Sequence, residues 1–390
     1  MNFDFKTPVN RKGTHSYKWD VEDHELPMWV ADMDFKTAPA ITQAILNRTH
    51  QDAFGYNIVP QSFYDSVAKW WKKRHHWDID PKWVMFCSGV VPAISSIVRK
   101  MTQPQEHVIV LSPVYNIFYN SIINNNRIVV ESKLNYQNET YSINFEDLEA
   151  KLSDPKSTLL IFCNPHNPIG KVWDKETLKK VGDLCIKHKV LIISDEIHCD
   201  LTHPEYTYTP MASISHDISQ NTITCISPTK TFNLAGLQTS AIVVANETVR
   251  KQVHRGINTD EVAEPNTFAI QACEAAFNHG EPWLNELLMI LQENRETLTQ
   301  AITSAFSELK IIQSEATYLA WLDCSNITDD TQALCDYIRK ETGLYLSAGH
   351  IFGGNGDQFI RWNYACPKTI LEDGISRFIK ALTHYQSNHT

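Results

Sequence analysis

Short β-rich runs alternate with helical patterns between about residues 52 and 278 of this 390-residue chain, and this alternation constrains the fold more than any other feature. It predicts an α/β domain with a mainly parallel central sheet, because each helix carries the chain back to begin the next parallel strand. The runs that we expect to form strands are 83–86, 107–111, 127–131, 159–163, 190–194, 222–226 and 240–245.

The pattern changes at about Glu281. A long helical stretch with apolar Trp283, Leu287 and Leu291 is followed by a short strand, a helix, two further short strands and a last helix. This succession predicts a smaller α+β domain. We therefore expect three parts: residues 1–50 as an N-terminal arm and first helix that pack with the small domain, residues 51–280 as the large domain, and residues 281–390 as the small C-terminal domain.

Composition excludes several classes of partner. The net charge of −10 argues against nucleic-acid binding, which needs a basic surface. No stretch approaches the roughly 20 apolar residues that span a bilayer, and the first residues lack the pattern of a signal peptide. The nine cysteines are scattered singly, which fits a reducing compartment. We expect a cytoplasmic protein with no nucleic-acid or membrane partner.

Polar residues follow three of the predicted strands, 159–163, 190–194 and 222–226, directly after each strand ends. In an open parallel sheet the carboxyl ends of neighbouring strands line one crevice, where ligands bind. We expect the following side chains to converge there: Asn167, Asp195, His198, Ser227 and Lys230.

Lys230 stands at a position that suits chemistry. It follows a buried strand and Ser227-Pro228-Thr229, so its amine is expected to be partly desolvated at the end of the sheet. A buried lysine shifts its pKa readily and can then attack a carbonyl carbon. By itself Ser-x-x-Lys is also compatible with an ordinary surface lysine.

The order of these motifs resembles a known superfamily. Asn-Pro-x-Asn-Pro-x-Gly at 164–170, Asp-Glu-Ile-His at 195–198 and Ser-x-x-Lys at 227–230 resemble the fold-type I pyridoxal 5′-phosphate (PLP) enzymes of aminotransferase class I/II. Nearly the whole chain takes part in the resemblance, which implies an aspartate aminotransferase-like fold. That is an α/β PLP-dependent transferase fold, with a mainly parallel central sheet in the large domain and a small α+β domain. Further stretches resemble the MalY/PatB group of cystathionine β-lyases (C-S lyases): 11–20, 28–35, 88–93 and 112–115.

The resemblance implies a role for three catalytic residues. Lys230 would form a Schiff base with PLP and later move the Cα proton. Asp195 would face the protonated ring nitrogen and keep the ring cationic. Tyr115 would stack on the ring. Without a cofactor, Asp195 could be a helix cap or a core ion pair, and Tyr115 could simply fill space.

Other cofactor contacts are implied in the same way. Asn167 would bond the phenolic oxygen of PLP. His198 stands where aminotransferases of this superfamily usually carry Tyr, so either a cofactor contact or a structural role is open for it. The phosphate would sit at a helix N-terminus, and Gln238 replaces an Arg that many aminotransferases use to grip it. The residues expected around the phosphate are Gly89, Val90, Val91, Ser227, Thr229 and Tyr56.

Tyr56 resembles a tyrosine that reaches the cofactor from the neighbouring subunit, which implies a homodimer with shared active sites. Arg361 would clamp the substrate α-carboxylate, since its planar fork matches a carboxylate in two bonds, with Asn167 assisting. The wall of the substrate site would be Trp29, Val30 and Ala31. A further hypothesis is an aromatic-rich pocket for the leaving group, made by Trp29, Tyr115, Trp362 and Tyr364.

The expected function is that of a PLP-dependent cysteine-S-conjugate β-lyase. Such an enzyme converts an S-substituted L-cysteine, an amino-acid thioether, to a thiol, pyruvate and ammonia. Two alternatives remain open: an aminotransferase for neutral or aromatic amino acids, and a regulatory binding protein that retains PLP. The histidines lack metal-ligand spacing to cysteines or carboxylates, so we predict no metal.

Overall fold

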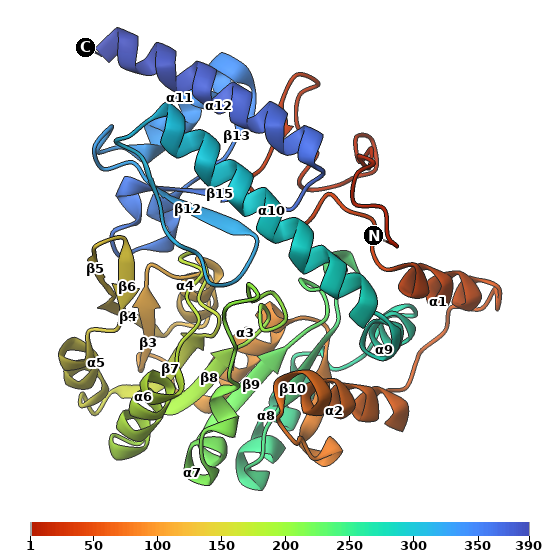
Figure 1. Cartoon of the computed structure of the whole chain (residues 1–390). Helices are drawn as coiled ribbons and strands as arrows, with labels where there is room; N and C mark the ends of the chain where they lie inside the picture. The colour runs from red at the N-terminus through yellow and green to blue at the C-terminus, as the bar shows by residue number, and fades with distance from the viewer. Residues whose placement is uncertain (1, 390) are drawn as a thin grey trace.

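The computed structural model describes residues 2–389, and its central sheet has seven strands. Helices pack around this sheet (Figure 1). The strands are β2 (Val84–Cys87), β3 (His107–Ser112), β4 (Ile128–Lys133), β7 (Ser157–Cys163), β8 (Leu191–Asp195), β9 (Thr222–Ile226) and β10 (Ser240–Val243). Their spatial order is β2-β10-β9-β8-β7-β3-β4. Neighbours are parallel except around β10, which runs antiparallel to both β2 and β9. The predicted α/β fold with a mainly parallel sheet is confirmed.

Helices cover both faces of this sheet because alternate strand residues point to opposite sides. Ile193 packs with residues of α3 (Val90–Met101), α4 (Ile117–Ile123) and α8 (Glu247–Thr259). Its neighbour Ile192 packs on the other face, with residues of three further helices. Those helices are α5 (Phe145–Leu152), α6 (Lys175–Lys187) and α7 (His216–Gln220). The central strands β7 and β9 are therefore mostly apolar and buried, whereas the edge strand β4 carries Glu131 and Lys133.

A second sheet is antiparallel and lies in the C-terminal part of the chain. Its order is β11-β12-β15-β14, and its strands are β11 (Lys310–Ile311), β12 (Leu319–Asp323), β14 (Ser347–Ala348) and β15 (Phe359–Asn363). The long helix α10 (Glu281–Ala305) contacts both α9 (Ala269–His279) and the last helix, so it joins the two parts of the molecule (Figure 1). The other helices here are α11 (Thr331–Thr342) and α12 (Lys368–His389).

The N-terminal arm is tied to the C-terminal part by a short parallel pair, β1 (Leu26–Pro27) with β13 (Leu344–Tyr345). The first helix, α1 (Pro39–Thr49), instead lies against α9, inside the range that we predicted for the large domain (Figure 1). An exposed loop joins α1 to α2 (Gln61–His75). The remaining strands form the hairpin β5 (Asn135–Gln137) and β6 (Thr140–Ser142). The proposed domain limits stay a prediction.

Among residues 2–389, no helix is both long enough and apolar enough to cross a bilayer.

Candidate active site

A cavity of about 290 Å³ opens at the carboxyl ends of β7, β8 and β9. These strands are adjacent and parallel, so the residues that follow them meet at one edge of the sheet. The predicted site residues that line it are Ala31, Gly89, Val90, Val91, Tyr115, Asn167, Asp195, His198, Thr229 and Lys230. Sequence reasoning did not single out Cys163, Ile197 and Thr239, which line it as well.

Lys230 reaches into this cavity, and its Nζ donates a hydrogen bond to the Ala31 carbonyl oxygen at 2.5 Å. Burial lowers the pKa of its amine to about 8, although the charges of Asp32 and Asp195 act in the opposite direction. Near neutral pH a useful fraction of this amine is therefore unprotonated, which is the form that acts as a nucleophile or a base.

Asp195 ends β8 and is buried, with the Ile197 N–H donating to its Oδ1 at 3.1 Å. Burial raises the pKa of this carboxyl to about 7, while the Ile197 hydrogen bond and the Lys230 charge oppose the rise. A cation placed against it would bring the pKa back down. Asp195 therefore suits a ligand that carries a positive charge.

His198 is buried beside Asp195, and its ring lies edge-on to Tyr318 with centroids 6.3 Å apart. Burial lowers the pKa of His198 to about 3, and the charges of Lys230 and Arg361 act in the same direction. The ring is therefore neutral at physiological pH. Its Nδ1 has no hydrogen-bond partner within the described part of the chain, so it is free to bond a ligand.

Arg361 lies on β15 and is buried, and no carboxylate of the described residues pairs with it. Its guanidinium donates to Asn167 Oδ1 at 3.4 Å and to the Trp29 carbonyl at 3.0 Å, and it lies over the Phe352 ring. Its Nε has no partner among the described residues, and burial lowers its pKa to about 10. A buried cation that lacks a counter-charge favours binding of an anion.

The start of α3 provides a second place for an anion. Gly89 precedes this helix, and its residues 89–91 line the cavity together with Thr229 and Gln238. Unpaired N–H groups of the first helical turn attract negative charge. Ser227 does not line the cavity: its Oγ bonds Thr229 Oγ1 at 2.6 Å and the Thr239 carbonyl at 2.7 Å, so it holds Thr229 in place.

Some predicted residues lie away from the cavity. Tyr56 is fully exposed on the loop between α1 and α2. Trp29 and Val30 do not line the cavity, but their backbone carbonyls accept hydrogen bonds from Arg361 and Asn363, respectively. The Trp29 ring stacks on Tyr345 instead, with centroids 4.9 Å apart.

The hypothesis of an aromatic-rich pocket is wrong for Trp362 and Tyr364. Both are fully buried in the core; the Trp362 indole N–H contacts Met28 Sδ, and the Tyr364 hydroxyl donates to the Thr317 carbonyl. They alternate with Arg361 in β15 and its continuation, so they point to the opposite face of the second sheet. Of the four aromatic residues, Tyr115 alone is among those that line the cavity.

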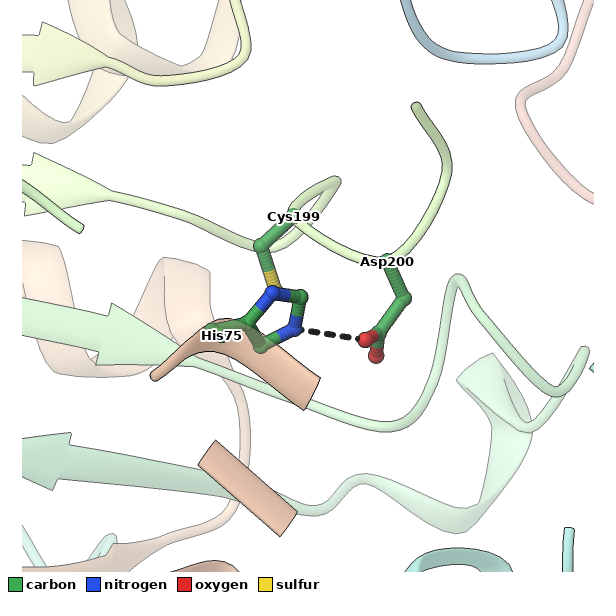
Figure 2. Close-up of side chains that lie close together, drawn as sticks. All are labelled: His75, Cys199 and Asp200. Atoms are coloured by element: carbon green, nitrogen blue, oxygen red, sulfur yellow. Dashed lines mark hydrogen bonds and ion pairs between the residues drawn. The ribbon is translucent and has the colours of Figure 1, made fainter. Parts of the chain in front are cut away.

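The side chains of His75, Cys199 and Asp200 lie close together as a cluster (Figure 2), and the Thr231 hydroxyl, next to Lys230 in the chain, bonds Asp200. Their ligand atoms lie within 4.8 Å of one another, as in a metal site. Asp200, however, already accepts hydrogen bonds from His75 at 2.8 Å, from the Trp70 indole and from the Thr231 hydroxyl.

The protonation states of the cluster also fit a structural role. Burial raises the pKa of the Cys199 thiol well above its ordinary value, and thiols bind metals as thiolates. Burial alone would raise the pKa of Asp200, but His75 and Arg74 together hold it below its ordinary value. Because Thr231 follows Lys230, we interpret the cluster as a support that ties the Lys230 loop to α2. Sequence reasoning missed it, since its partners lie more than a hundred residues apart.

The sequence model of the family "Aminotransferase class I and II" matches residues 26–378. The chain is 40% identical over 390 residues to cystathionine beta-lyase PatB of Bacillus subtilis, covering 98% of this chain and all of that protein. It is 32% identical to protein MalY of Escherichia coli, with 97% and 99% of the two chains covered. It also superposes on cystalysin of Treponema denticola, a crystal structure that contains PLP, with a TM-score of 0.95, 33% identity and coverage of 98% and 100%. The family predicted from the motifs is thus confirmed, and this chain belongs to the class I and II aminotransferases.

Proposed function

We propose that this protein is a PLP-dependent C-S β-lyase that acts on S-substituted L-cysteines. The observation that carries the proposal is that Lys230 and Asp195 line one cavity at the ends of β7, β8 and β9, while Arg361 bonds Asn167 in the wall of that cavity. Curated relatives of nearly the same length that bear the name cystathionine beta-lyase favour a lyase over other activities of the superfamily.

The residues present fit PLP. Asp195, a buried carboxyl with a raised pKa, suits a protonated pyridine nitrogen, and the unpartnered Nδ1 of His198 is available to a polar group of the ring. The N-terminus of α3 and the Thr229 hydroxyl suit the phosphate, and the Lys230 amine suits the aldehyde. When bound, PLP supplies an electron sink that stabilises negative charge at the substrate Cα.

The protein then selects the bond that breaks. Arg361, assisted by Asn167, holds the substrate α-carboxylate and so fixes the Cα–H bond toward Lys230. The neutral Lys230 amine takes the Cα proton. The electron pair left at Cα forms the Cα–Cβ double bond, and the Cβ–S pair leaves with the sulfur as a thiolate. The released aminoacrylate adds water and yields pyruvate and ammonia.

The aminotransferase alternative uses the same residues up to the removal of the proton. It would differ only in the fate of that proton, and no residue of the cavity by itself selects between the two outcomes. The names of the relatives favour elimination. A regulatory protein that retains PLP without catalysis would not need a buried Lys230 amine in the cavity together with a buried Arg361 bonded to Asn167 of the cavity wall.

We further infer that the protein is a homodimer with shared sites. The loop between α1 and α2 exposes large apolar side chains: Phe54 at 57%, Tyr56 at 100% and Ile58 at 82%. Apolar groups gathered on one loop favour burial against a partner, and a second copy is the partner that the resemblance implies for Tyr56. The cytoplasm stays the predicted compartment, since the nine cysteines are all buried free thiols.

The deciding experiment mixes purified holoenzyme with an S-alkyl L-cysteine in the absence of any keto acid. We expect thiol and pyruvate in equal amounts, and loss of both in Lys230→Ala. Lys171→Ala, which removes a lysine paired with Glu315 outside the cavity, is the matched control. Turnover that requires an added keto acid and releases no thiol would contradict the lyase and favour the aminotransferase.

A further inference from the structure

The segment from Trp29 to Asp34 runs along the candidate active site and presents backbone carbonyls to it. The Ala31 carbonyl accepts hydrogen bonds from Lys230 Nζ at 2.5 Å and from the Tyr318 hydroxyl at 3.0 Å. The Trp29 carbonyl accepts a hydrogen bond from Arg361 at 3.0 Å. One short stretch of backbone therefore contacts both the proposed base and the proposed carboxylate clamp.

Charged residues of the N-terminal arm form ion pairs with Asp32 and Asp34 of this segment. Arg11 donates in two parallel bonds to Asp32, at 2.6 and 2.8 Å, and in a third to Asp34 at 3.2 Å. Lys18 donates to Asp34 at 2.7 Å and to the Asp32 carbonyl at 3.1 Å. The Trp19 indole completes the set with a bond to Asp34 at 2.8 Å. We name Arg11, Lys18, Asp32 and Asp34 the arm clamp.

The arm clamp is too costly to be an ordinary surface network. Lys18 and Asp34 are each only 1% exposed, and burying such a pair carries a desolvation cost that the pairing barely offsets. Two cations face two carboxylates, so the clamp is neutral as a whole. An arm that only needed to adhere to the small domain could do so with apolar contacts.

We propose that the arm clamp is a positioning device for Lys230: it fixes the Ala31 carbonyl as the acceptor that orients the amine. The proposal rests on the proposed function, in which a free Lys230 amine moves the Cα proton. Lysine has a flexible four-carbon stem, so an unheld amine would sample many rotamers. A carbonyl acceptor restricts them and still leaves the amine its proton-accepting lone pair.

The clamp also sets the electrostatics around Lys230. The charged groups that face this amine are Asp32, Asp195 and Arg361. Asp32 acts to raise the pKa of Lys230, and both oxygens of its carboxylate are paired with Arg11. Loss of Arg11 and loss of Asp32 would break the same ion pair but change the charge near Lys230 in opposite directions.

Opposite shifts in the pKa of Lys230 are expected from the proposed role, whereas a purely structural role of the arm clamp predicts no such opposite shifts. Apoprotein variants Asp32→Asn and Arg11→Gln are labelled with acetic anhydride over a pH series, and mass spectrometry follows the Lys230 peptide. We expect the midpoint of Lys230 labelling to move to lower pH in Asp32→Asn and to higher pH in Arg11→Gln. Arg11→Lys, which keeps the charge, should restore the wild-type midpoint.

The arm itself provides the matched control. Glu25 forms an equally bidentate pair with Arg339, at 2.6 and 2.9 Å, but this pair holds the arm next to β13 rather than at Ala31. In the holoenzyme we expect Asp32→Asn to lower kcat about 10- to 100-fold with KM changed less than about threefold. Glu25→Gln should lower the melting temperature about as much as Asp32→Asn does. It should leave kcat and the pH midpoint of Lys230 labelling unchanged.

Two results would overturn the proposal: unchanged Lys230 labelling in both Asp32→Asn and Arg11→Gln, or a loss of kcat in Glu25→Gln equal to that in Asp32→Asn. Failure of the proposed function would look different. In that case the wild-type holoenzyme releases no thiol, while the opposite shifts in apoprotein labelling still occur.

Discussion

At the scale of single residues, burial decides the chemistry of the site more than pairing does. Burial lowers the pKa of Lys230 and His198 and raises that of Asp195, in each case as the first cause. Each shift favours the neutral form of the side chain, so a charged ligand group that binds next to one of these residues meets little charge of the same sign. Arg361 is likewise a buried cation that no carboxylate within residues 2–389 pairs with.

The Arg361→Lys variant tests the role of that cation. Lysine keeps the charge but cannot make two parallel bonds, so a charged hydrogen bond is lost. We expect KM for the amino-acid substrate to rise about 10- to 100-fold, which corresponds to the free energy of one hydrogen bond between charged groups. The change in kcat should be smaller. Steady-state kinetics at saturating PLP check this. Arg295→Lys, at an arginine that donates to the Ser314 carbonyl outside the cavity, should leave KM unchanged.

The positions of residues that directly follow strands could be predicted from the sequence. Contacts between residues far apart in the sequence could not. Asn167, Asp195 and Lys230 could be predicted because strand ends converge whatever the loops do. Trp362 was misplaced because the sequence does not reveal which face of β15 turns to the cavity. The bonds of Arg11 to Asp32 and Asp34 could not be predicted, since an irregular arm has no periodicity from which to infer contacts.

At the scale of elements, the limits of the large-sheet strands shifted by one or two residues. In the C-terminal part the structure contains the short strands β11 and β13 beyond those that the sequence pattern predicted. The predicted run 190–194 is the strand Leu191–Asp195, and 127–131 is Ile128–Lys133. The antiparallel direction of β10 was not predictable, because a strand's own residues do not encode the direction of its neighbours. Nor did the pattern reveal that α1 lies on α9, since amphipathic helices fit several apolar surfaces.

The turn after β8 carries an element-level prediction. Glu196 is fully buried and accepts hydrogen bonds from Ser194, Tyr208 and the Met211 N–H. Burial raises its pKa to about 7 from an ordinary value of 4.5. The folded state therefore binds more protons than the unfolded state between these values, and stability from this group falls as pH rises through that window.

We expect the wild type to lose up to about 3 kcal/mol of stability from this group between pH 5 and pH 8, at roughly 1.4 kcal/mol per pKa unit. Glu196→Gln cannot ionise and should lose none of it. Differences in melting temperature between the two proteins, measured at several pH values, should therefore narrow as pH rises. A difference that is constant from pH 5 to pH 8 would contradict the raised pKa.

At the scale of the whole molecule, the exposed loop that carries Tyr56 sets the next prediction. If Tyr56 serves the site of a second copy, two inactive variants can complement each other. We expect Tyr56→Ala and Lys230→Ala, mixed and re-equilibrated, to recover about a quarter of wild-type activity, since about half of the dimers are hybrids and each hybrid has one intact site.

The control for this mixture is Lys230→Ala with Asp195→Ala. Both residues line one cavity of one chain, so no hybrid of these two variants contains an intact site. Recovery with the control pair, or none with the Tyr56→Ala pair, would contradict a shared site. Sedimentation of the unmixed proteins shows independently whether they are dimers.

The position of β2 at the edge of the central sheet has a consequence for synthesis on the ribosome. Within that sheet β2 pairs only with β10, whose residues leave the ribosome about 150 positions later. Until then β2 has no strand to pair with, and the Gly89–Val91 turn that follows it in the chain has no completed sheet beside it. Arg361 emerges later still. The nascent chain therefore completes its active site last, and the cofactor meets a fully formed binding site only after translation has passed the whole large sheet.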